Sequence, residues 1–386
     1  PIPPARPAII VCENAHPAPP DAQRILILRL GAVGDVVRTL PAARMLREAY
    51  PRAHLAWLVE RGSAALLERQ PWIDEIIVFP REALRADLRR LHWLRMGSTL
   101  AEFVRRLRAA RFDLVVDFHA ILKSGVLAWA SRSPRRVSYA RPYGRELSWL
   151  FATERARLSP RRASRFDRNT GLVHFLGIRG EPARVALAVD PDAVARLEAA
   201  MGDGVAPIAI HPGTSDDTPY KRYTVTGYAA VARALFEGDG LPSIVTHGPA
   251  RGDLELAERI VAAARGAARL APPTPSLVDL AALFSRCRAY VGSDTGPMHV
   301  ASLVGIPVVQ ILGPTDPLVN APYPGTPSRS VRVPVPCSPC RRGCAAATCM
   351  RAVSPEQVIG AVRELIGTRR ARPAARVPGA SGGPRA

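Results

Sequence analysis

Three short segments place polar side chains directly after apolar runs, where a parallel sheet would present them to a ligand. The first is Gly31-Ala-Val-Gly34-Asp35, which follows the apolar run at residues 25–28. Its two glycines let the backbone approach a ligand closely, and a helix N-terminus beyond them would favour an anion. Spacing alone leaves two interpretations of Asp35: an N-cap of the next helix, or a general base at the mouth of a cleft. We expect the regular helix to start at Thr39-Leu40-Pro41, because proline fits a first turn.

The second segment is Gly292-Ser-Asp294-Thr295-Gly296-Pro-Met-His299. It predicts the end of a strand, a turn of small residues, and a helix with Thr295 as its N-cap. Backbone N–H groups and the helix dipole at such a turn suit a diphosphate, and Asp294 could accept hydrogen bonds from sugar hydroxyls. The alternative is an ordinary strand-to-helix turn in which His299 is a half-buried packing residue.

The third segment is His211-Pro-Gly-Thr214-Ser215, followed by Lys221. Of the 53 lysines and arginines in the chain, only Lys123 and Lys221 are lysines. Because the chain uses arginine almost everywhere else, the two lysines indicate sites where a compact ammonium is needed and a planar guanidinium does not fit. A contact with a phosphate is one such site. The alternative for Lys221 is a solvated surface side chain.

Four of the six cysteines lie within thirteen residues and have the spacing C-x2-C-x3-C-x4-C: Cys337, Cys340, Cys344 and Cys349. Four thiols can bind zinc, although structural zinc sites usually join two knuckles through a longer loop. A structural metal, an iron–sulfur cluster, redox-labile disulfides and packed thiols all fit this pattern. Six cysteines in 386 residues do not make a secreted disulfide scaffold, so we expect a cytoplasmic protein.

The composition is that of a folded protein with a strong positive charge. Apolar residues make up 47% and charged residues 22%, and no apolar stretch is long enough to span a membrane. Of the net charge of +20, residues 81–111 contribute +6 and residues 132–168 contribute +8. These segments are either solvated helix faces or a surface for an anionic acceptor or membrane. Nucleic acid is not expected, because aromatic residues are only 6% and no binding motif is found.

Apolar runs alternate with helical patterns along most of the chain. We predict strands at residues 24–28, 54–59, 75–79, 113–118, 136–139, 207–211, 243–247, 289–292 and 307–312. Helices are predicted at residues 40–49, 100–110, 226–236, 254–264, 277–287 and 297–303. This α/β pattern favours two doubly wound, Rossmann-like domains that face each other across a cleft. The predicted divisions are a flexible Pro-rich leader (1–20), a first domain (21–180), a connection (181–206), a second domain (207–368) and a disordered basic tail (369–386).

Taken in order, these blocks resemble the bacterial lipopolysaccharide heptosyltransferases of glycosyltransferase family 9, over about residues 24–366. The resemblance rests on residues 25–41, 117–124, 211–221, 292–301 and 313–317 and on the cysteine set, and the second block is most like the type I enzymes. It implies a GT-B architecture, with the acceptor bound by the first domain and the nucleotide sugar by the second. It also implies metal-independent transfer with inversion, with no cofactor and no metal in the active site.

The resemblance also implies a role for individual residues. Asp35 would be the general base. The donor, ADP-heptose, would be bound by Lys221, Asp294, Thr295, Gly296, Thr214, Ser215, Asp253 and His299. The acceptor, an anionic Kdo–lipid A, would be bound by Gly34, Lys123, Arg168 and His119. His119-Ala120 stands where the family usually has Gln-Gly, which bears on the choice of acceptor. The protein would lie peripherally on the inner face of the inner membrane.

Three other functions are compatible with the same blocks. One is a family 9 transferase with a different nucleotide sugar, and another is a nucleotide-sugar epimerase with the GT-B fold. A non-catalytic basic scaffold is the third, but a scaffold has no use for Asp35, Lys221 and Asp294 together at the ends of strands.

Overall fold

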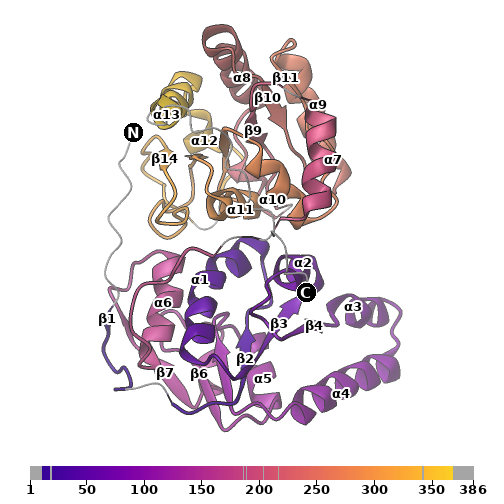
Figure 1. Cartoon of the computed structure of the whole chain (residues 1–386), viewed down its shortest axis with the longest axis vertical. Helices are drawn as coiled ribbons and strands as arrows, with labels where there is room; N and C mark the ends of the chain where they lie inside the picture. Colours follow the sequence, from indigo (N-terminus) through magenta and orange to yellow (C-terminus); the bar gives the residue numbers. More distant parts are fainter. Residues whose placement is uncertain are drawn as a thin grey trace, which may run out of the picture.

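The structure, a computed structural model, describes residues 11–17, 20–185, 187, 189–202, 204–215, 217–340 and 343–367. It contains two six-stranded sheets, one in each half of the molecule (Figure 1). The first comprises β2 (Arg24–Leu28), β3 (His54–Glu60), β4 (Glu75–Phe79), β5 (Leu114–Asp117), β6 (Arg135–Tyr139) and β7 (Glu154–Ala156). The second comprises β9 (Ile208–His211), β10 (Ser243–Val245), β11 (Ala268–Leu270), β12 (Ala289–Ser293), β13 (Val308–Ile311) and β14 (Ser328–Val331).

Both sheets are parallel throughout and have the same strand order. The first runs β4-β3-β2-β5-β6-β7 and the second β11-β10-β9-β12-β13-β14. In this order the chain changes direction between β2 and β5 in one sheet, and between β9 and β12 in the other. A doubly wound sheet binds its ligand outside the carboxyl ends of the strands at that change of direction. The predicted α/β fold with two Rossmann-like domains is confirmed.

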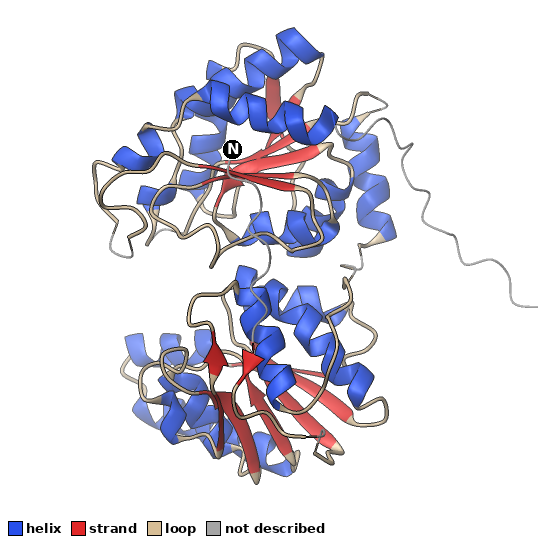
Figure 2. Ribbon diagram, turned by 90° about the vertical axis from the view of Figure 1, so that its left-hand side faces the viewer, coloured by secondary structure: helices blue, strands red, loops and turns tan. Residues whose placement is uncertain are grey.

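Helices lie on both faces of each sheet (Figure 2). The first domain contains α1 (Val33–Ala49), α2 (Arg61–Glu68), α3 (Arg81–Arg89), α4 (Trp93–Ala109), α5 (Leu122–Ala130), η1 (Ser148–Leu150) and α6 (Arg165–Phe175). The second contains η2 (Pro219–Lys221), α8 (Val225–Asp239), α9 (Arg251–Ala263), α10 (Leu277–Ser285), α11 (Gly296–Val304), α12 (Thr348–Arg351) and α13 (Pro355–Gly367). Among the described helices, none is both long and apolar enough to cross a membrane.

Two segments predicted to lie outside the domains contain ordered elements. The predicted connection, 181–206, holds α7 (Pro191–Met201), which packs against α10 of the second domain. In the predicted leader, β1 (Val11–Cys12) pairs antiparallel with β8 (Leu158–Ser159) of the first domain. Residues 1–10, 18–19 and 368–386 lie outside the described residues, and so do the remaining leader and the basic tail that we predicted there.

Helix α1 starts seven residues earlier than predicted, at Val33, so Pro41 lies in its interior rather than in its first turn. Val36 and Val37 in the early turns are fully buried, and this packing outweighs the hydrogen bond that proline cannot donate. As a result Val33, Gly34 and Asp35 of the glycine segment form the first turn of the helix, with Ala32 as its N-cap.

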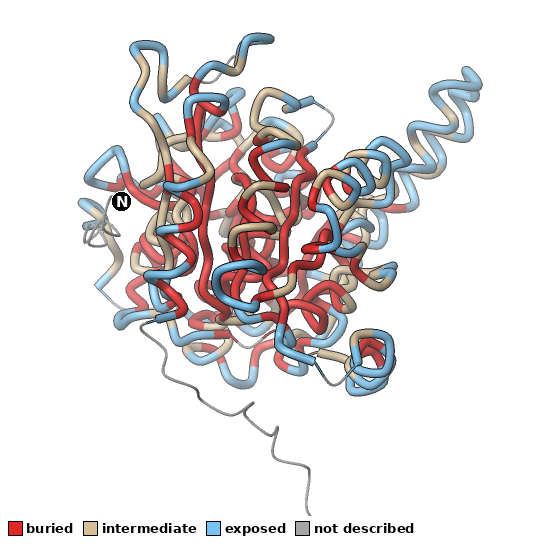
Figure 3. The backbone as a smooth tube through the Cα atoms, turned by 90° about the horizontal axis from the view of Figure 1, so that it is seen from above, coloured by how far each residue is buried: buried red, intermediate tan, exposed pale blue. Residues whose placement is uncertain are grey.

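The two domains share an apolar core. Figure 3 shows the buried backbone gathered in the middle of the molecule. One cluster runs from Val36 and Leu40 of α1 to Leu283 of α10 and Met298 of α11. Helices α1 and α2 of the first domain therefore pack directly on α11 and α10 of the second.

Candidate active site

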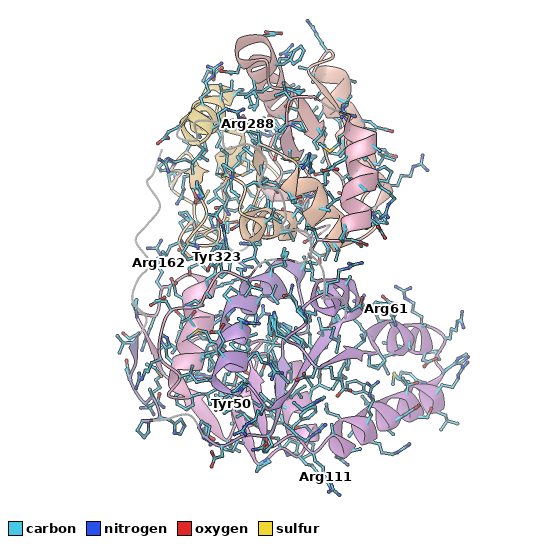
Figure 4. The ribbon with its side chains drawn as sticks, viewed as in Figure 1. Tyr50, Arg61, Arg111, Arg162, Arg288 and Tyr323 are labelled. Atoms are coloured by element: carbon cyan, nitrogen blue, oxygen red, sulfur yellow. The ribbon has the colours of Figure 1, made fainter. Side chains whose placement is uncertain are left out.

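The N-terminal turns of α1 and α11 meet where the two domains touch. A Cβ added to Gly34 would lie 3.3 Å from the Gly296 Cα and 2.8 Å from Cδ2 of His299. Only the absence of side chains at these two glycines allows so close an approach. Two more contacts join the domains along the same boundary. Arg162 of the first domain donates to the two carboxylate oxygens of Asp316 in the second at 2.8 and 2.9 Å, and the ring centroid of Phe166 lies 5.4 Å from that of Tyr323. Figure 4 labels Arg162 and Tyr323 at the domain boundary.

Asp35 is held by arginines from three elements. Arg29, which follows β2, pairs with its Oδ2. Arg38 of α1 and Arg165 of α6 each place a nitrogen 2.6 Å from its Oδ1. The N-cap of α1 is Ala32, and Asp35 is the third residue of the helix, so the interpretation of Asp35 as an N-cap is wrong. Its side chain is instead the centre of a charged cluster.

The environment of Asp35 keeps it ionised. Burial alone would raise its pKa, but the guanidinium groups of Arg29, Arg38 and Arg165 hold the pKa well below its usual range. Arg29 and Arg38 are themselves only 4% and 5% exposed, and burial lowers the pKa of Arg38 to about 10. While all three guanidiniums touch the carboxylate, it is a weak proton acceptor.

Lys221 and Asp294 form the opposite side of the site. The Nζ of Lys221 lies 3.1 Å from Oδ2 of Asp294, whose side chain is 8% exposed. Burial would raise the pKa of Asp294, but His299 and the Lys221 ammonium hold it far below its usual range. Burial lowers the pKa of His299 to about 4, and its Nε2 lies 3.6 Å from Oδ1 of Asp294. The imidazole is thus neutral and carries no positive charge that would compete with the Lys221 ammonium for the Asp294 carboxylate.

The turn after β12 has the predicted form. Thr295 is the N-cap of α11, and the helix starts at Gly296 with Pro297 in its first turn. The Thr295 hydroxyl makes no capping hydrogen bond. The first-turn N–H groups therefore point toward the domain interface without a side-chain acceptor, which is the arrangement that binds anions at helix N-termini.

Three further residues that were predicted to bind the donor gather around Arg222, beyond the ends of β9 and β10. The Arg222 Nε donates to Oγ1 of Thr214 at 3.2 Å, and its Nη2 lies 3.7 Å from Oδ1 of Asp253. Ser215 is exposed beside them. The structure thus brings Thr214, Ser215 and Asp253 into one group around Arg222, the residue that follows Lys221.

The predicted acceptor residues divide into two places. Lys123 lies on Glu60, at the end of β3, with Nζ 2.5 Å from Oε1, and Arg81 pairs with the other oxygen of the same carboxylate. His119 is near Arg29 and Asp35, and burial, followed by the charge of Arg29, lowers its pKa to about 3.

Arg168 lies over two tyrosine rings, 5.3 Å from the Tyr139 centroid and 5.4 Å from the Tyr143 centroid. Its charge contributes to the low pKa of Asp35. Gly34, the last of the predicted acceptor residues, instead contacts α11. His119 and Arg168 therefore accompany Asp35, whereas Lys123 belongs to a cluster with Glu60.

Comparisons with known proteins identify the family. The model of glycosyltransferase family 9 (heptosyltransferase) matches residues 100–350, which is more than half of the chain. The chain belongs to this family. It is 29% identical to lipopolysaccharide heptosyltransferase 1 of Pseudomonas aeruginosa, over 82% of this chain and 86% of that protein.

Solved structures show the same GT-B fold. The family 9 glycosyltransferase of Veillonella parvula aligns with a TM-score of 0.74 at 23% identity, covering 92% of this chain and all of that one. The heptosyltransferase WaaC of Escherichia coli, solved with ADP-2-deoxy-2-fluoro heptose, aligns with a TM-score of 0.67 at 21% identity, covering 88% of this chain and 99% of that one. The protein is therefore a glycosyltransferase with the GT-B fold, as predicted.

Sequence reasoning missed the arginines that surround Asp35 in this family 9 enzyme. Arg29, Arg38 and Arg165 are three of 51 arginines, so residue type gave no signal of the kind that singled out the two lysines. The one available signal was position: Arg29 directly follows a buried strand, and Arg38 is three residues beyond Asp35 on the same helix.

The cysteine set does not form a metal site in the structure. Within the described part of the chain, no group of three or more His, Cys, Asp and Glu side chains is placed to hold a metal ion. Cys337 and Cys344 are exposed, whereas Cys349 is buried against Gly313. The short loop spreads the thiols between solvent and core, so the hypothesis of a structural metal is not supported.

Proposed function

We propose that the protein transfers heptose from ADP-heptose to the Kdo or inner-core region of lipid A in lipopolysaccharide biosynthesis, with inversion and without a catalytic metal. The observation that carries this proposal is the position of the Asp35 carboxylate. It lies on the first domain beside the Gly34–Gly296 contact, opposite the Lys221–Asp294 pair of the second domain. The similarity to lipopolysaccharide heptosyltransferases supports the choice of sugar and acceptor.

Inversion requires a base on one face of the anomeric carbon and a leaving group on the other. In the proposed step, Asp35 accepts the proton of an acceptor hydroxyl while that oxygen forms a bond to the anomeric carbon. The bond between this carbon and the diphosphate oxygen breaks, and ADP leaves with the electron pair. Opposed groups from two domains supply this geometry because each domain holds one substrate.

The donor side has positive groups for the departing diphosphate. The Lys221 ammonium is a compact charge, and the N–H groups at the start of α11 add the positive end of a helix dipole. Asp294 would accept hydrogen bonds from sugar hydroxyls, and the group around Arg222 extends the same surface. We include no metal or other cofactor in the step, because the Lys221 ammonium and the N–H groups at the start of α11 can stabilise the negative charge of the departing diphosphate.

The proposed acceptor is anionic and carried by a lipid. His119 and Arg168, which accompany Asp35 on the first domain, would bind it with Lys123. We accordingly propose that the protein acts at the cytoplasmic face of the inner membrane.

Two variants of Asp35 test whether this residue is the general base. Asp35→Glu keeps the negative charge for the arginines but moves the carboxylate by one methylene, so the fold should survive. Asp35→Asn cannot accept a proton, and it leaves two buried guanidiniums without a carboxylate, at a cost of about 3–5 kcal/mol in stability. We expect turnover to fall about a hundredfold or more in both.

Donor binding should survive in Asp35→Glu, because the second domain holds the nucleotide sugar. It is measured as the rise in melting temperature with ADP-heptose, next to other nucleotide sugars. Turnover within a few-fold of the wild type in a folded Asp35→Glu variant would contradict the role of Asp35. A larger thermal shift with a different nucleotide sugar would contradict the donor.

A further inference from the structure

The exposed apolar side chains of this protein are concentrated in one stretch of the first domain. Ten of the thirteen large apolar side chains exposed in the described residues fall between residues 88 and 150: Leu88, Leu91, Trp93, Leu94, Leu100, Leu122, Val126, Trp129, Leu147 and Leu150. Single exposed apolar residues are normal on protein surfaces, but a contiguous group marks an interaction site.

Helices α3 and α4 form a hairpin that projects from the domain (Figure 1). No residue of α3 is buried, and in α4 only Phe103 and Leu107, near its C-terminal end, are buried. The projecting helices at the right of Figure 3 are accordingly exposed. The tip of the hairpin carries Leu91 (67% exposed) and Leu94 (91% exposed) with no core of its own beneath them.

The apolar stripe of α4 extends beyond the part of the helix that packs against the domain core. Trp93, Met96, Leu100, Phe103 and Leu107 are spaced alternately by three and four residues, so they share one face of the helix. Phe103 and Leu107 pack against the domain, whereas Trp93 and Leu100 are 56% and 42% exposed although α3 lies beside them. The helix thus extends an apolar face past the end of its own domain.

A second apolar stripe adjoins the hairpin. Leu122, Val126 and Trp129 lie on one face of α5 at the spacing i, i+4 and i+7, and all three are exposed. Helix η1, which is preceded by the exposed Leu147 and ends at the exposed Leu150, packs against α5. The C-terminal ends of α4 and α5 are joined, because the Arg108 Nε donates to the carbonyl of Ala130 at 3.1 Å. We call this surface of α3, α4, α5 and η1 the basic apolar face.

Arginines surround the apolar residues of the hairpin. Residues 81–111 carry nine arginines and three acidic residues, a net charge of +6. Arg81 and Arg106 form ion pairs with Glu60 and Glu75. Arg85, Arg89, Arg90 and Arg95, close to the tip, have no ion pair within the residues that the structure describes. The free positive charge therefore lies beside the exposed leucines and tryptophan.

We propose that the basic apolar face docks on an anionic lipid surface, with the tip of the α3–α4 hairpin inserted at the headgroup level. Leucine and tryptophan beside unpaired arginines are the composition of helices that lie in a membrane interface. Leu88, Leu91 and Leu94 follow one another around the turn of a narrow hairpin, so a folded partner would have to enclose the tip. A fluid lipid surface surrounds such a tip without a preformed pocket.

This inference rests on the proposed function, because a lipid-borne acceptor explains why the face belongs to the first domain. The two can nevertheless be tested apart, since docking on lipid needs neither donor nor acceptor. The chosen assay is flotation of the full chain with vesicles of phosphatidylethanolamine and phosphatidylglycerol, next to vesicles of phosphatidylcholine alone.

The wild type should float with the anionic vesicles and not with phosphatidylcholine. Binding should weaken at least about tenfold between about 0.1 and 1 M salt, as the Debye length falls from about 10 to 3 Å. The variant Leu91→Gln/Trp93→Gln/Leu94→Gln, and separately Arg85→Glu/Arg89→Glu, should each bind at least about tenfold more weakly. Their melting temperatures should match the wild type, because the tip has no buried residue.

Matched controls lie on the second domain. Phe236→Gln removes an exposed apolar side chain, and Arg259→Glu/Arg265→Glu reverses two exposed charges, all outside the basic apolar face. Both should bind vesicles like the wild type. Turnover of a detergent-solubilised acceptor by the tip variant should also be unchanged, which separates docking from catalysis.

Three results would overturn the inference. Vesicle binding by the tip variant equal to that of the wild type would show that another surface binds lipid. If the wild type bound phosphatidylcholine vesicles as well as the anionic ones, the arginines would have no role in the binding. Concentration-dependent self-association that the tip variant abolishes, without any wild-type flotation, would make the face an interface between copies of this chain.

Discussion

At Asp35 the arginines that keep the carboxylate ionised also make it a weak base. Arg29 and Arg38 are buried and fixed, since Arg29 also donates to the Phe118 carbonyl and Arg38 to the carbonyl of Gly34. Arg165, with its side chain 33% exposed, is the most accessible of the three. An anionic acceptor that draws Arg165 away from Asp35 would strengthen the base at the moment that substrate is present.

Replacement of Arg165 should move the pH dependence of the reaction. Because the pKa of Asp35 is held well below its usual range, protonation of this proposed base should limit the wild-type enzyme only at correspondingly low pH. Arg165→Gln removes one of three cations, so the pKa should rise and the acidic limb of kcat/KM should move to higher pH. Arg162→Gln, which breaks a pair with Asp316 instead, is the matched control. An acidic limb at the same pH in both variants would contradict the assignment.

Among the elements, the sequence predicts the central strands and misses three of the four edge strands of the two large sheets. Every predicted strand is present, and β2 and β4 have the predicted ends. The missed edge strands β7, β11 and β14 are short and have the sequences ERA, ARL and SRSV, because an edge strand needs no continuous apolar run. The two-residue strands β1 and β8 were missed as well. Asp35 and Asp294 could be found from their place after such runs, whereas the arginine cluster depends on packing between α1 and α6, which periodicity does not encode.

The turn between β5 and α5 is stabilised by one buried carboxyl group. Asp117 accepts hydrogen bonds from the backbone N–H groups of His119 and Ala120 at 2.9 and 3.0 Å and from the Ser124 hydroxyl at 2.9 Å. Burial outweighs these bonds and raises its pKa to about 6. The turn that carries His119 and Lys123 thus depends on an acid that folds more favourably when protonated.

This carboxyl group should make the fold less stable as pH rises from about 4 to 6. In that range the folded state binds more protons than the unfolded state, so the free energy of unfolding falls by about 2–3 kcal/mol from this group. Asp117→Asn should remove that part of the slope in urea unfolding. Asp316→Asn should leave the slope in this range unchanged, because Arg162 lowers the pKa of Asp316 below it. An unchanged slope in Asp117→Asn would contradict the prediction.

At the scale of the whole molecule, the proposed reaction requires the two domains to approach each other closely. The shared core and the contact of α1 with α11 hold the two domains together. The backbone of Arg165 donates to the Val319 carbonyl, and Arg38 donates to Asn320, so two arginines of the Asp35 cluster also contact the second domain. The position of Asp35, the proposed base, and the approach of the domains are therefore set by the same side chains.

Gly34→Ala tests this dependence with a single methyl group. In an ordinary helix, alanine is more stable than glycine by about 1 kcal/mol. At Gly34 the new Cβ would lie 2.8 Å from the buried ring of His299 and 3.3 Å from the Gly296 backbone, so the domains must separate slightly to accept it. Since a displacement of about 1 Å can cost about a hundredfold in rate, we expect kcat to fall about tenfold or more. ADP-heptose should still raise the melting temperature, because the groups proposed to bind it on the second domain are unaltered. Gly360→Ala in α13, where the added Cβ meets nothing within 4 Å, should gain stability and keep full turnover. If Gly34→Ala behaved like Gly360→Ala in both measurements, the close approach of α1 and α11 would have no part in catalysis.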